Sequence, residues 1–154
     1  MGVEVERKFL IAELPDWLDG CEARPIRQGY VALDGDTEVR VRAHGDARRL
    51  TIKHGGGLAR AEVEVDLDDA AFEELWALTA GRRLSKVRYA LPTEHRSFEV
   101  DVYGEEVGDL AVAEVEFESV AESEDFEPPP WLGDEVTEDP RFKNRHLAEH
   151  GKPH

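Results

Sequence analysis

Hydrophobic and polar residues alternate one by one along much of the chain, which is typical of β-strands with one face buried and the other polar. In the first such segment, Val5 and Phe9 fall on one side and Glu6 and Lys8 on the other. The same alternation predicts eight strands: Val3–Leu10, Arg27–Leu33, Thr37–Ala43, Arg48–His54, Leu58–Leu67, Leu84–Leu91, Arg96–Tyr103 and Leu110–Ser119. Because most of the intervening turns are short and contain Gly, Asp or Pro, we expect most neighbouring strands to pair antiparallel.

Helical spacing of apolar residues is clear in one long segment, Asp68–Ala80. A short helical turn at Pro15–Leu18 is also expected, and a late helix is predicted to begin after Asp139 and to end before Gly151. No repeat and no linker long enough to separate domains interrupts the pattern. The sequence therefore predicts one β-rich α+β domain over residues 1–154.

Composition excludes several classes of protein. The chain of 154 residues has 19 Lys and Arg against 35 Asp and Glu, a net charge of −16, which disfavours nucleic-acid and membrane partners. Cys21 is the only cysteine, so an internal disulfide and a multi-cysteine zinc site are excluded. No apolar run approaches the roughly 18 residues of a membrane span. We expect a cytoplasmic protein, with monomer and homodimer both open.

The polar positions of the predicted strands carry charges of both signs. An open sheet can leave such a face in water, but eight strands can also close into a barrel whose alternate residues point inward. Because the helix at Asp68–Ala80 must cover the apolar face, we expect a closed eight-stranded antiparallel barrel with a few helices packed outside and a charged interior. The charged positions are Glu4, Glu6, Lys8, Arg40, Arg42, Lys53, Arg60, Glu62, Glu64, Lys86, Arg88, Glu99, Asp101, Glu114 and Glu116.

A charged interior indicates a charged ligand, because unpaired buried ions are costly and stability alone is a poor reason to build them. Cations two residues apart on one strand face, such as Arg40 and Arg42, repel each other unless an anion lies between them. Phosphate groups fit this requirement. Paired carboxylates such as Glu114 and Glu116 suit Mg²⁺ or Mn²⁺, which take oxygen ligands and bridge carboxylates to phosphate oxygens.

Seven short motifs carry these positions along the chain. They are Glu4-Val5-Glu6-Arg7-Lys8, Arg27-Gln28-Gly29-Tyr30, Arg40-Val41-Arg42, Leu50-Thr51-Ile52-Lys53, Arg60-Ala61-Glu62-Val63-Glu64, Lys86-Val87-Arg88-Tyr89 and Ala113-Glu114-Val115-Glu116-Phe117. Together they resemble the CYTH domain of the triphosphate tunnel metalloenzymes, in particular its short bacterial inorganic triphosphatase-like members. The resemblance runs from Val3 through the C-terminal tail.

The resemblance implies an eight-stranded tunnel that binds triphosphate with a divalent cation, Mg²⁺ or Mn²⁺, and hydrolyses its terminal phosphoryl group. We also assign Arg60, which shares the charged face, to substrate binding. The substrate-binding residues are then Lys8, Arg40, Arg42, Lys53, Arg60, Lys86 and Arg88. The metal-binding residues are Glu4, Glu6, Glu62, Glu64, Glu114 and Glu116.

The expected reaction is in-line attack of water on a terminal phosphorus, converting inorganic triphosphate to diphosphate and phosphate. Tyr30 is the candidate proton acceptor, provided that Lys86 lies close enough to lower its pKa. A water held by Glu4 and Glu6 is the competing choice. Thiamine triphosphatase activity, adenylyl cyclase activity of the class IV type, and non-catalytic binding of polyphosphate or nucleotide stay open as alternatives.

Overall fold

The computed structural model describes residues 5–55, 61–92 and 97–153. The strands in these residues are β1 (Val5–Leu10), β2 (Glu22–Asp34), β3 (Thr37–His44), β4 (Ala47–His54), β5 (Ala61–Asp66), β6 (Arg83–Leu91), β7 (Phe98–Tyr103) and β8 (Ala111–Phe117). The helices are η1 (Asp16–Gly20), α1 (Asp69–Ala77), α2 (Val120–Asp125), η2 (Pro140–Phe142) and α3 (Asn144–His150). None of the helices found in these ranges is long and apolar enough to cross a bilayer.

All eight strands belong to one antiparallel sheet, in the order β1-β8-β7-β6-β2-β3-β4-β5. Each of them falls on a segment whose alternation predicted a strand. The largest difference is at β2, which begins at Glu22 rather than at the predicted Arg27. Its early residues pair with β6, and this pairing joins the two halves of the sheet.

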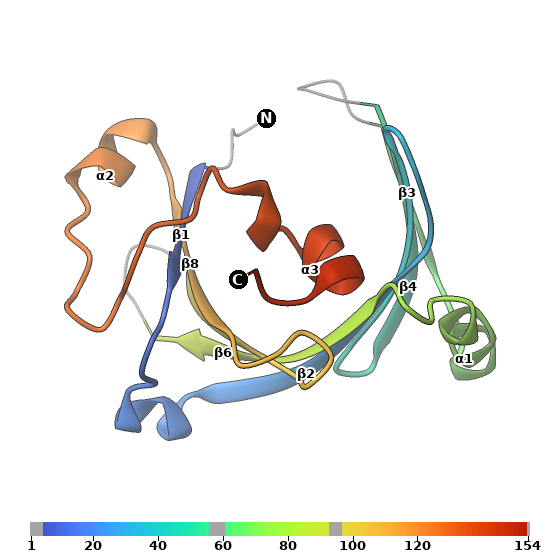
Figure 1. Ribbon diagram of the computed structural model, residues 1–154, viewed down its shortest axis with the longest axis horizontal. Helices are drawn as coiled ribbons and strands as arrows, with labels where there is room; N and C mark the ends of the chain where they lie inside the picture. Colours follow the sequence, from blue (N-terminus) through green and yellow to red (C-terminus); the bar gives the residue numbers. More distant parts are fainter. Residues whose placement is uncertain (1–4, 56–60, 93–96, 154) are drawn as a thin grey trace.

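The predicted closed eight-stranded barrel is wrong, because the sheet stays open as a curved cradle (Figure 1). Its two edges are β1 and β5, which do not pair with each other in the described residues. The outer edge of β1 is covered by a C-terminal segment: Gly133 N–H donates to the Leu10 carbonyl at 2.7 Å, Leu10 N–H to Asp134 at 2.9 Å, and Val136 N–H to Lys8 at 2.8 Å. Since these backbone groups are already bonded, this edge does not accept β5.

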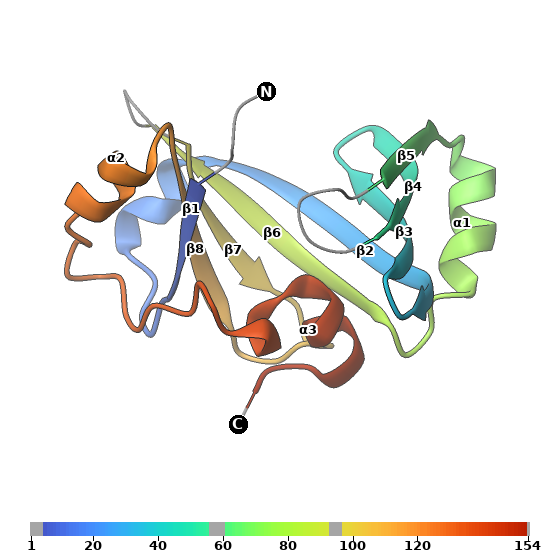
Figure 2. The ribbon, with the colours of Figure 1, turned by 90° about the horizontal axis from the view of Figure 1, so that it is seen from above.

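The convex face of the cradle carries the apolar side of the strands, as the alternation predicts. Helix α1 packs there against β2, β3 and β4, with Phe72 buried on Val41 and Ala43 (Figure 2). The Asp68 side chain caps α1 by accepting a hydrogen bond from the Ala71 N–H at 2.7 Å. Helix α2, which the sequence pattern did not predict, contacts β1 and β8.

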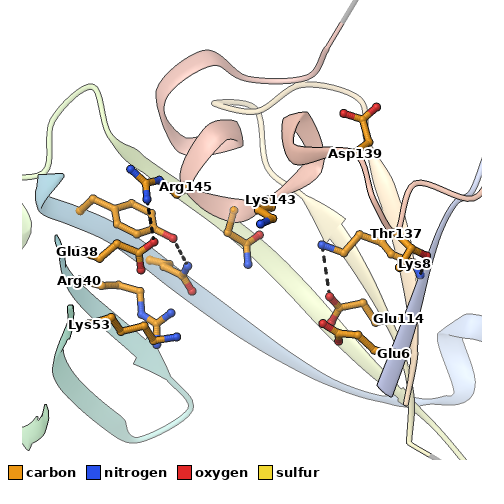
Figure 3. A pocket seen from close by; sticks show the side chains of 13 residues that line it. Glu6, Lys8, Glu38, Arg40, Lys53, Glu114, Thr137, Asp139, Lys143 and Arg145 are labelled. Carbon is orange, nitrogen blue, oxygen red and sulfur yellow. Dashed lines mark hydrogen bonds and ion pairs between the residues drawn. The ribbon is translucent and has the colours of Figure 1, made fainter. Parts of the chain in front are cut away.

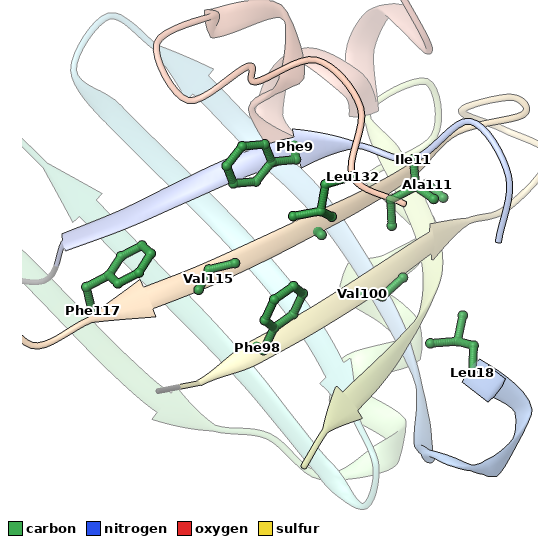
Figure 4. Close-up of a cluster of buried hydrophobic side chains, with 10 residues drawn as sticks. Phe9, Ile11, Leu18, Phe98, Val100, Ala111, Val115, Phe117 and Leu132 are labelled. Carbon is green, nitrogen blue, oxygen red and sulfur yellow. The ribbon is translucent and has the colours of Figure 1, made fainter. Parts of the chain in front are cut away.

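The largest apolar cluster lies on the convex side of β1, β8 and β7 (Figure 4). It includes Phe9, Phe98, Val100, Val115 and Phe117, which are all less than 10 % exposed. This packing holds together the three strands whose opposite faces carry carboxylates.

Helix α3 lies on the concave side, so the expectation that the helices pack outside the sheet is wrong for α3 (Figure 1). Its Leu147 and Ala148 are buried with Leu84, Tyr103 and Val112. These three residues occupy concave-face positions of β6, β7 and β8, where the predicted polar face becomes apolar at one end. Helix α3 therefore fills that end of the cradle and leaves the other end lined by charges.

Candidate functional site

The concave face brings most of the predicted charged positions together. Residues directly opposite each other in an antiparallel pair lie on the same face. Glu6 is opposite Glu116, and Lys8 is opposite Glu114. On the other side of the cradle Lys53 is opposite Glu62.

A cavity of about 330 Å³ lies over this face, between the two arms of the cradle and beside η2 and α3 (Figure 3). We call it the central pocket. It is lined by Glu6, Lys8, Gln28, Tyr30, Glu38, Arg40, Lys53, Glu114, Thr137, Asp139, Lys143, Asn144 and Arg145. Polar and charged side chains of β1, β8, β2, β3, β4 and the C-terminal segment thus converge on one space.

The two walls of the central pocket differ in charge. Glu6 and Glu114 project from β1 and β8, whereas Arg40 and Lys53 project from β3 and β4 (Figure 3). Lys8 lies on the carboxylate side, where its ammonium group is 3.5 Å from Glu114. Carboxylates on one wall and cations on the other suit a ligand that combines a metal cation with a polyanion.

Two buried guanidinium nitrogens in this region lack a hydrogen-bond partner. The Nε–H groups of Arg40 and Arg42 are buried and donate to no acceptor in the described residues. Arg40 lines the central pocket, whereas Arg42 lies farther along β3 and does not line it. A buried donor without a partner costs about 1–3 kcal/mol, and more when the group is charged. Repulsion adds to this cost, because burial and then the charges of Arg88 and Arg40 lower the pKa of Arg42. Both observations indicate a place for an anion.

Lys86 and Arg88 are held by a buried carboxylate on the neighbouring strand. Asp101 accepts a hydrogen bond from Lys86 Nζ at 2.9 Å and from Arg88 Nε and Nη2 at 2.8 and 2.9 Å. Lys86 is 3 % exposed and Asp101 is 5 % exposed. In the described residues neither Lys86 nor Arg88 lines the central pocket. Asp101 therefore compensates part of the positive charge of Lys86 and Arg88.

This pairing has the expected electrostatic effects. Burial opposes ionisation of Asp101, but the charge of Lys86 and the hydrogen bonds from Arg88 outweigh it and lower the pKa of Asp101 to about 2. Burial lowers the pKa of Lys86, although Asp101 counteracts it. Asp101 is thus ionised at neutral pH.

Tyr30 lies on the floor of the central pocket, but its surroundings do not lower its pKa. Burial raises the pKa of the Tyr30 hydroxyl, and a hydrogen bond from Gln28 only partly offsets this. Gln28 Nε2 donates to the Tyr30 hydroxyl at 2.9 Å. Lys86, whose closeness was the condition for a lowered Tyr30 pKa, instead donates to Asp101 and lies 5.4 Å from the Tyr103 ring centre. Tyr30 is therefore a protonated hydroxyl at neutral pH.

The remaining predicted site residues are spread more widely. Glu62 and Glu64 lie on β5, and neither lines the central pocket in the described residues. Glu64 instead pairs with Arg49 at 3.3 Å. Glu4 and Arg60 lie outside the described residues.

The donor set on β1 and β8 fits a hard divalent cation. Glu6 and Glu114 line the central pocket, and Glu116 faces Glu6 across the strand pair. No group of three His, Cys, Asp or Glu side chains that would form an all-protein metal cage occurs in residues 5–55, 61–92 and 97–153. Mg²⁺ is usually held by one or two carboxylates together with substrate phosphates and water. The residues present match that mode of binding.

The C-terminal tail supplies pocket residues that the sequence analysis did not assign to the site. Lys143 and Arg145 face the strands across the central pocket, and Arg145 lies 3.6 Å from Glu38 (Figure 3). Asn144 also lines the pocket. The available signal was local charge: residues 139–154 contain four Lys and Arg against two Asp and Glu, the reverse of the whole chain. Glu38 itself shares the strand face of Arg40 and Arg42.

Similar proteins are known for nearly the whole chain. A Nitrosomonas europaea protein named inorganic triphosphatase is 46% identical over 148 residues, which cover 94% of this chain and 96% of that protein. An Acetivibrio thermocellus protein of the same name is 35% identical over 150 residues, covering 96% and 94%. A crystal structure of an inorganic triphosphatase superimposes with a TM-score of 0.84 at 40% identity and covers 99% of both chains.

No family model matches the sequence. Both alignments nevertheless cover nearly the whole of this chain and nearly the whole of each relative. The chain belongs to the inorganic triphosphatases of the CYTH-domain family.

Proposed function

We propose that this chain hydrolyses inorganic triphosphate to diphosphate and phosphate in the central pocket. The observation that carries the proposal is the buried Nε donor of Arg40, which lies on the wall opposite Glu6 and Glu114 and has no hydrogen-bond partner in the described part of the chain. The names of the two curated relatives support the same activity.

The lining of the central pocket favours an inorganic substrate over an organic triphosphate. Tyr30 is the one aromatic lining residue in the described part of the chain, and no aliphatic side chain accompanies it. Sites for organic ligands are lined predominantly by hydrophobic and aromatic side chains. A thiamine or adenosine group would find no such surface here.

The metal is proposed to be Mg²⁺ or Mn²⁺, held by Glu6 and Glu114 together with substrate phosphates and water. Glu116, and Glu4 from outside the described residues, are further candidate ligands. When bound, it would neutralise phosphate charge and orient the substrate. The cationic side chains would bind the phosphate oxygens. Arg40 and Lys53 would bind the phosphate oxygens from the opposite wall, Arg42 would bind them from farther along β3, and Lys8 would bind them from the carboxylate side.

Phosphoryl transfer depends mainly on positioning and electrostatic stabilisation of the equatorial and leaving oxygens. Fixed cations around the central pocket would stabilise the leaving diphosphate. Lys86 and Arg88, held by Asp101, would contribute positive potential beneath it. The protonated Tyr30 hydroxyl would orient the attacking water or a phosphate oxygen through its own hydrogen, because its oxygen already accepts from Gln28.

The test is release of phosphate from inorganic triphosphate, thiamine triphosphate, ATP and long polyphosphate, each with Mg²⁺, Mn²⁺ or a chelator. We expect rapid release from inorganic triphosphate with metal and little from the other three. Faster phosphate release from ATP or thiamine triphosphate would show that the preferred substrate is that compound and not inorganic triphosphate. Tight binding of triphosphate with no release would make the chain a non-catalytic binder.

Other features support a cytoplasmic location. Cys21 is a free thiol, which is the usual state in a reducing compartment. As to partners rather than location, the net charge of −16 opposes association with nucleic acid.

Glu116→Gln is expected to raise the Mg²⁺ concentration needed for half-maximal activity by about tenfold or more, because it removes a charged ligand that faces Glu6. The maximal rate at saturating metal should fall much less. Glu118→Gln is the matched control, since Glu118 is exposed just beyond the end of β8. An unchanged metal requirement in Glu116→Gln would remove Glu116 from the proposed ligand set.

Tyr30→Phe is expected to lower kcat by about 10²-fold while leaving KM nearly unchanged, because the lost hydroxyl acts on the reacting groups rather than on the whole polyanion. Steady-state kinetics with inorganic triphosphate measure both parameters. Gln28→Leu, which removes only the hydrogen bond to Tyr30, should have a smaller effect of the same kind. An unchanged kcat in Tyr30→Phe would show that this tyrosine is purely structural.

A further inference from the structure

Two neighbouring cavities lie around the end of β1, outside the central pocket. The first has a volume of about 420 Å³ and is formed by residues 12–16 and 130–133. The second has a volume of about 380 Å³ and lies where β1 ends and β8 begins. Because Ala12 and Gly133 line both cavities, the two form one continuous groove, which we call the acidic groove. In the described part of the chain it shares no lining residue with the central pocket.

The floor of the acidic groove is apolar and belongs to the core. Ile11, Ala111 and Leu132 line it and are members of the largest apolar cluster (Figure 4). All three are less than 10 % exposed. Because the core fixes these side chains, the groove is formed before anything binds, which keeps the cost of ordering low.

Two tryptophans lie at one end of the acidic groove. Trp131 lines the groove, and its ring centre is 5.5 Å from that of the core residue Phe98. Trp17 packs edge to face on Trp131 at 5.2 Å and 83° but is still 49 % exposed. Leu14, which also lines the groove, is 43 % exposed. Tryptophan is enriched among the residues that dominate binding energies, and a ring already held by packing loses little freedom on binding. The pair is therefore an anchor for an apolar or cationic side chain.

The rim of the acidic groove carries carboxylates that have no partner. Glu13, Asp16, Asp109 and Asp134 line the groove and are exposed. None of these four side chains forms an ion pair or accepts a hydrogen bond within residues 5–55, 61–92 and 97–153. Lys152 is the one cation among the lining residues that the structure describes. The rim therefore carries four negative charges against one positive charge.

Charge and shape together define the ligand that fits. A negative rim repels nucleic acid and anionic lipid and attracts Lys and Arg. The apolar floor and the exposed Trp17 suit aliphatic side chains, and a guanidinium group can also stack on the tryptophan rings. A second copy of the same groove does not fit, because the two rims would repel each other.

We propose that the acidic groove binds a basic peptide segment of a partner protein, in which Arg or Lys alternates with apolar residues. The apolar side chains lie on the floor and against Trp17, and the cations lie over the rim carboxylates. Neither this interaction nor its residues are part of the proposed triphosphatase site. The two proposals can therefore fail separately.

The test is calorimetric titration of the protein with a short synthetic peptide in which Arg alternates with Leu. We expect a Kd on the order of 10⁻⁵ M at low salt, and the affinity should fall as NaCl is added. Two comparison peptides, one with Glu in place of Arg and one with Ser in place of Leu, should bind at least about tenfold more weakly. A Ser peptide that binds as tightly as the Leu peptide would show attraction to the net charge alone and would overturn the proposal.

Trp17→Ala is expected to weaken binding of the Arg-Leu peptide by about tenfold, because it removes the exposed anchor. Leu14→Ser should weaken it in the same direction, and this variant tests the groove even if Trp17→Ala disturbs η1. Leu78→Ala is the matched control, since Leu78 is 58 % exposed beside the end of α1. Equal weakening in Leu78→Ala, or none in Trp17→Ala and Leu14→Ser, would overturn the proposal.

The double variant Glu13→Gln with Asp16→Asn tests the rim. It should weaken peptide binding by about fivefold and reduce its dependence on salt. Glu74→Gln is the control, because Glu74 is exposed on α1 and has the same charge. A loss in Glu74→Gln as large as in the double variant would show that only the total charge matters and would overturn the proposal.

Activity and assembly measurements separate the remaining outcomes. Trp17→Ala should release phosphate from inorganic triphosphate at the wild-type rate, and Glu114→Gln should bind the peptide with wild-type affinity. Loss of peptide binding in Glu114→Gln but not in Trp17→Ala would place the peptide in the central pocket and overturn the proposal. Sedimentation that shows a dimer in the wild type and a monomer in Trp17→Ala would assign the groove to contacts between copies and would also overturn it. A protein that binds the peptide but releases no phosphate would refute only the proposed function.

Discussion

Asp101→Asn lowers the free energy of unfolding by about 3–5 kcal/mol, because it leaves Lys86 and Arg88 as buried cations without their carboxylate. Lys86 is almost completely buried, so water does not replace the lost partner. Urea denaturation at pH 7 measures the change as a shift of the midpoint at constant slope. Activity should fall as well, because both cations lose their fixed position beneath the central pocket.

Glu99→Gln is the control for Asp101→Asn. Glu99 lies two residues earlier on β7, is only half-buried, and approaches Arg88 at 3.5 Å. Its loss should cost about 1 kcal/mol or less. A cost for Asp101→Asn as small as that for Glu99→Gln would contradict the interpretation of Asp101 as the residue that holds Lys86 and Arg88.

The interaction of Asp101 with Lys86 and Arg88 also makes the stability of the fold sensitive to acid. The pKa of Asp101 is lowered in the folded protein from 3.8 to about 2. Its contribution to stability is therefore fully present above pH about 4 and is lost as the pH falls through about 2, and it amounts to something on the order of 2 kcal/mol. Asp101→Asn should lack this part of the acid dependence.

Arg42→Ala is expected to raise KM for inorganic triphosphate by about 10- to 100-fold, which corresponds to the loss of one or two charged hydrogen bonds. The stability of the protein should not fall in parallel. Arg42 faces Arg49 across the strands, and its buried Nε donor finds no partner among residues 5–55, 61–92 and 97–153, so removing Arg42 relieves repulsion. Loss of affinity at unchanged or increased stability is the signature of a residue kept for ligand binding.

Arg27→Gln is the control for Arg42→Ala, because Arg27 lies on the convex side, where it pairs with Glu73 and stacks on Phe72. Its KM should equal that of the wild type. A KM unaffected by Arg42→Ala, or a fall in stability as large as that from Asp101→Asn, would assign Arg42 a structural role.

The strands and their faces were predictable, whereas the closure of the sheet was not. Alternation such as Val39-Arg40-Val41-Arg42 determines which side chains point away from the apolar core, and the structure has these arginines on the concave face. Closure depends on what pairs with the outer edge of β1. Backbone groups of Gly133 and Val136 occupy that edge. Backbone pairing of this kind has no side-chain signature.

The candidate site was predictable as a face but not as a set of partners. Periodicity placed Lys86 and Asp101 on the same side of the sheet without showing that they bind each other at 2.9 Å. It also gave no reason to place Lys143 and Arg145 over the strands, since Leu147 and Ala148, which anchor α3 in the cradle, resemble any short apolar helix face. Both the Lys86–Asp101 pair and the position of Lys143 and Arg145 depend on contacts between segments that are far apart in the sequence.

The central claim is that the charged concave face is where triphosphate binds. A crystal structure of the protein soaked with inorganic triphosphate and Ca²⁺ tests it most directly. The account predicts phosphate oxygens within hydrogen-bond distance of Arg40 and Arg42, with Ca²⁺ beside Glu6 and Glu114. Triphosphate bound on the convex face, or bound without contact to either arginine, would contradict it.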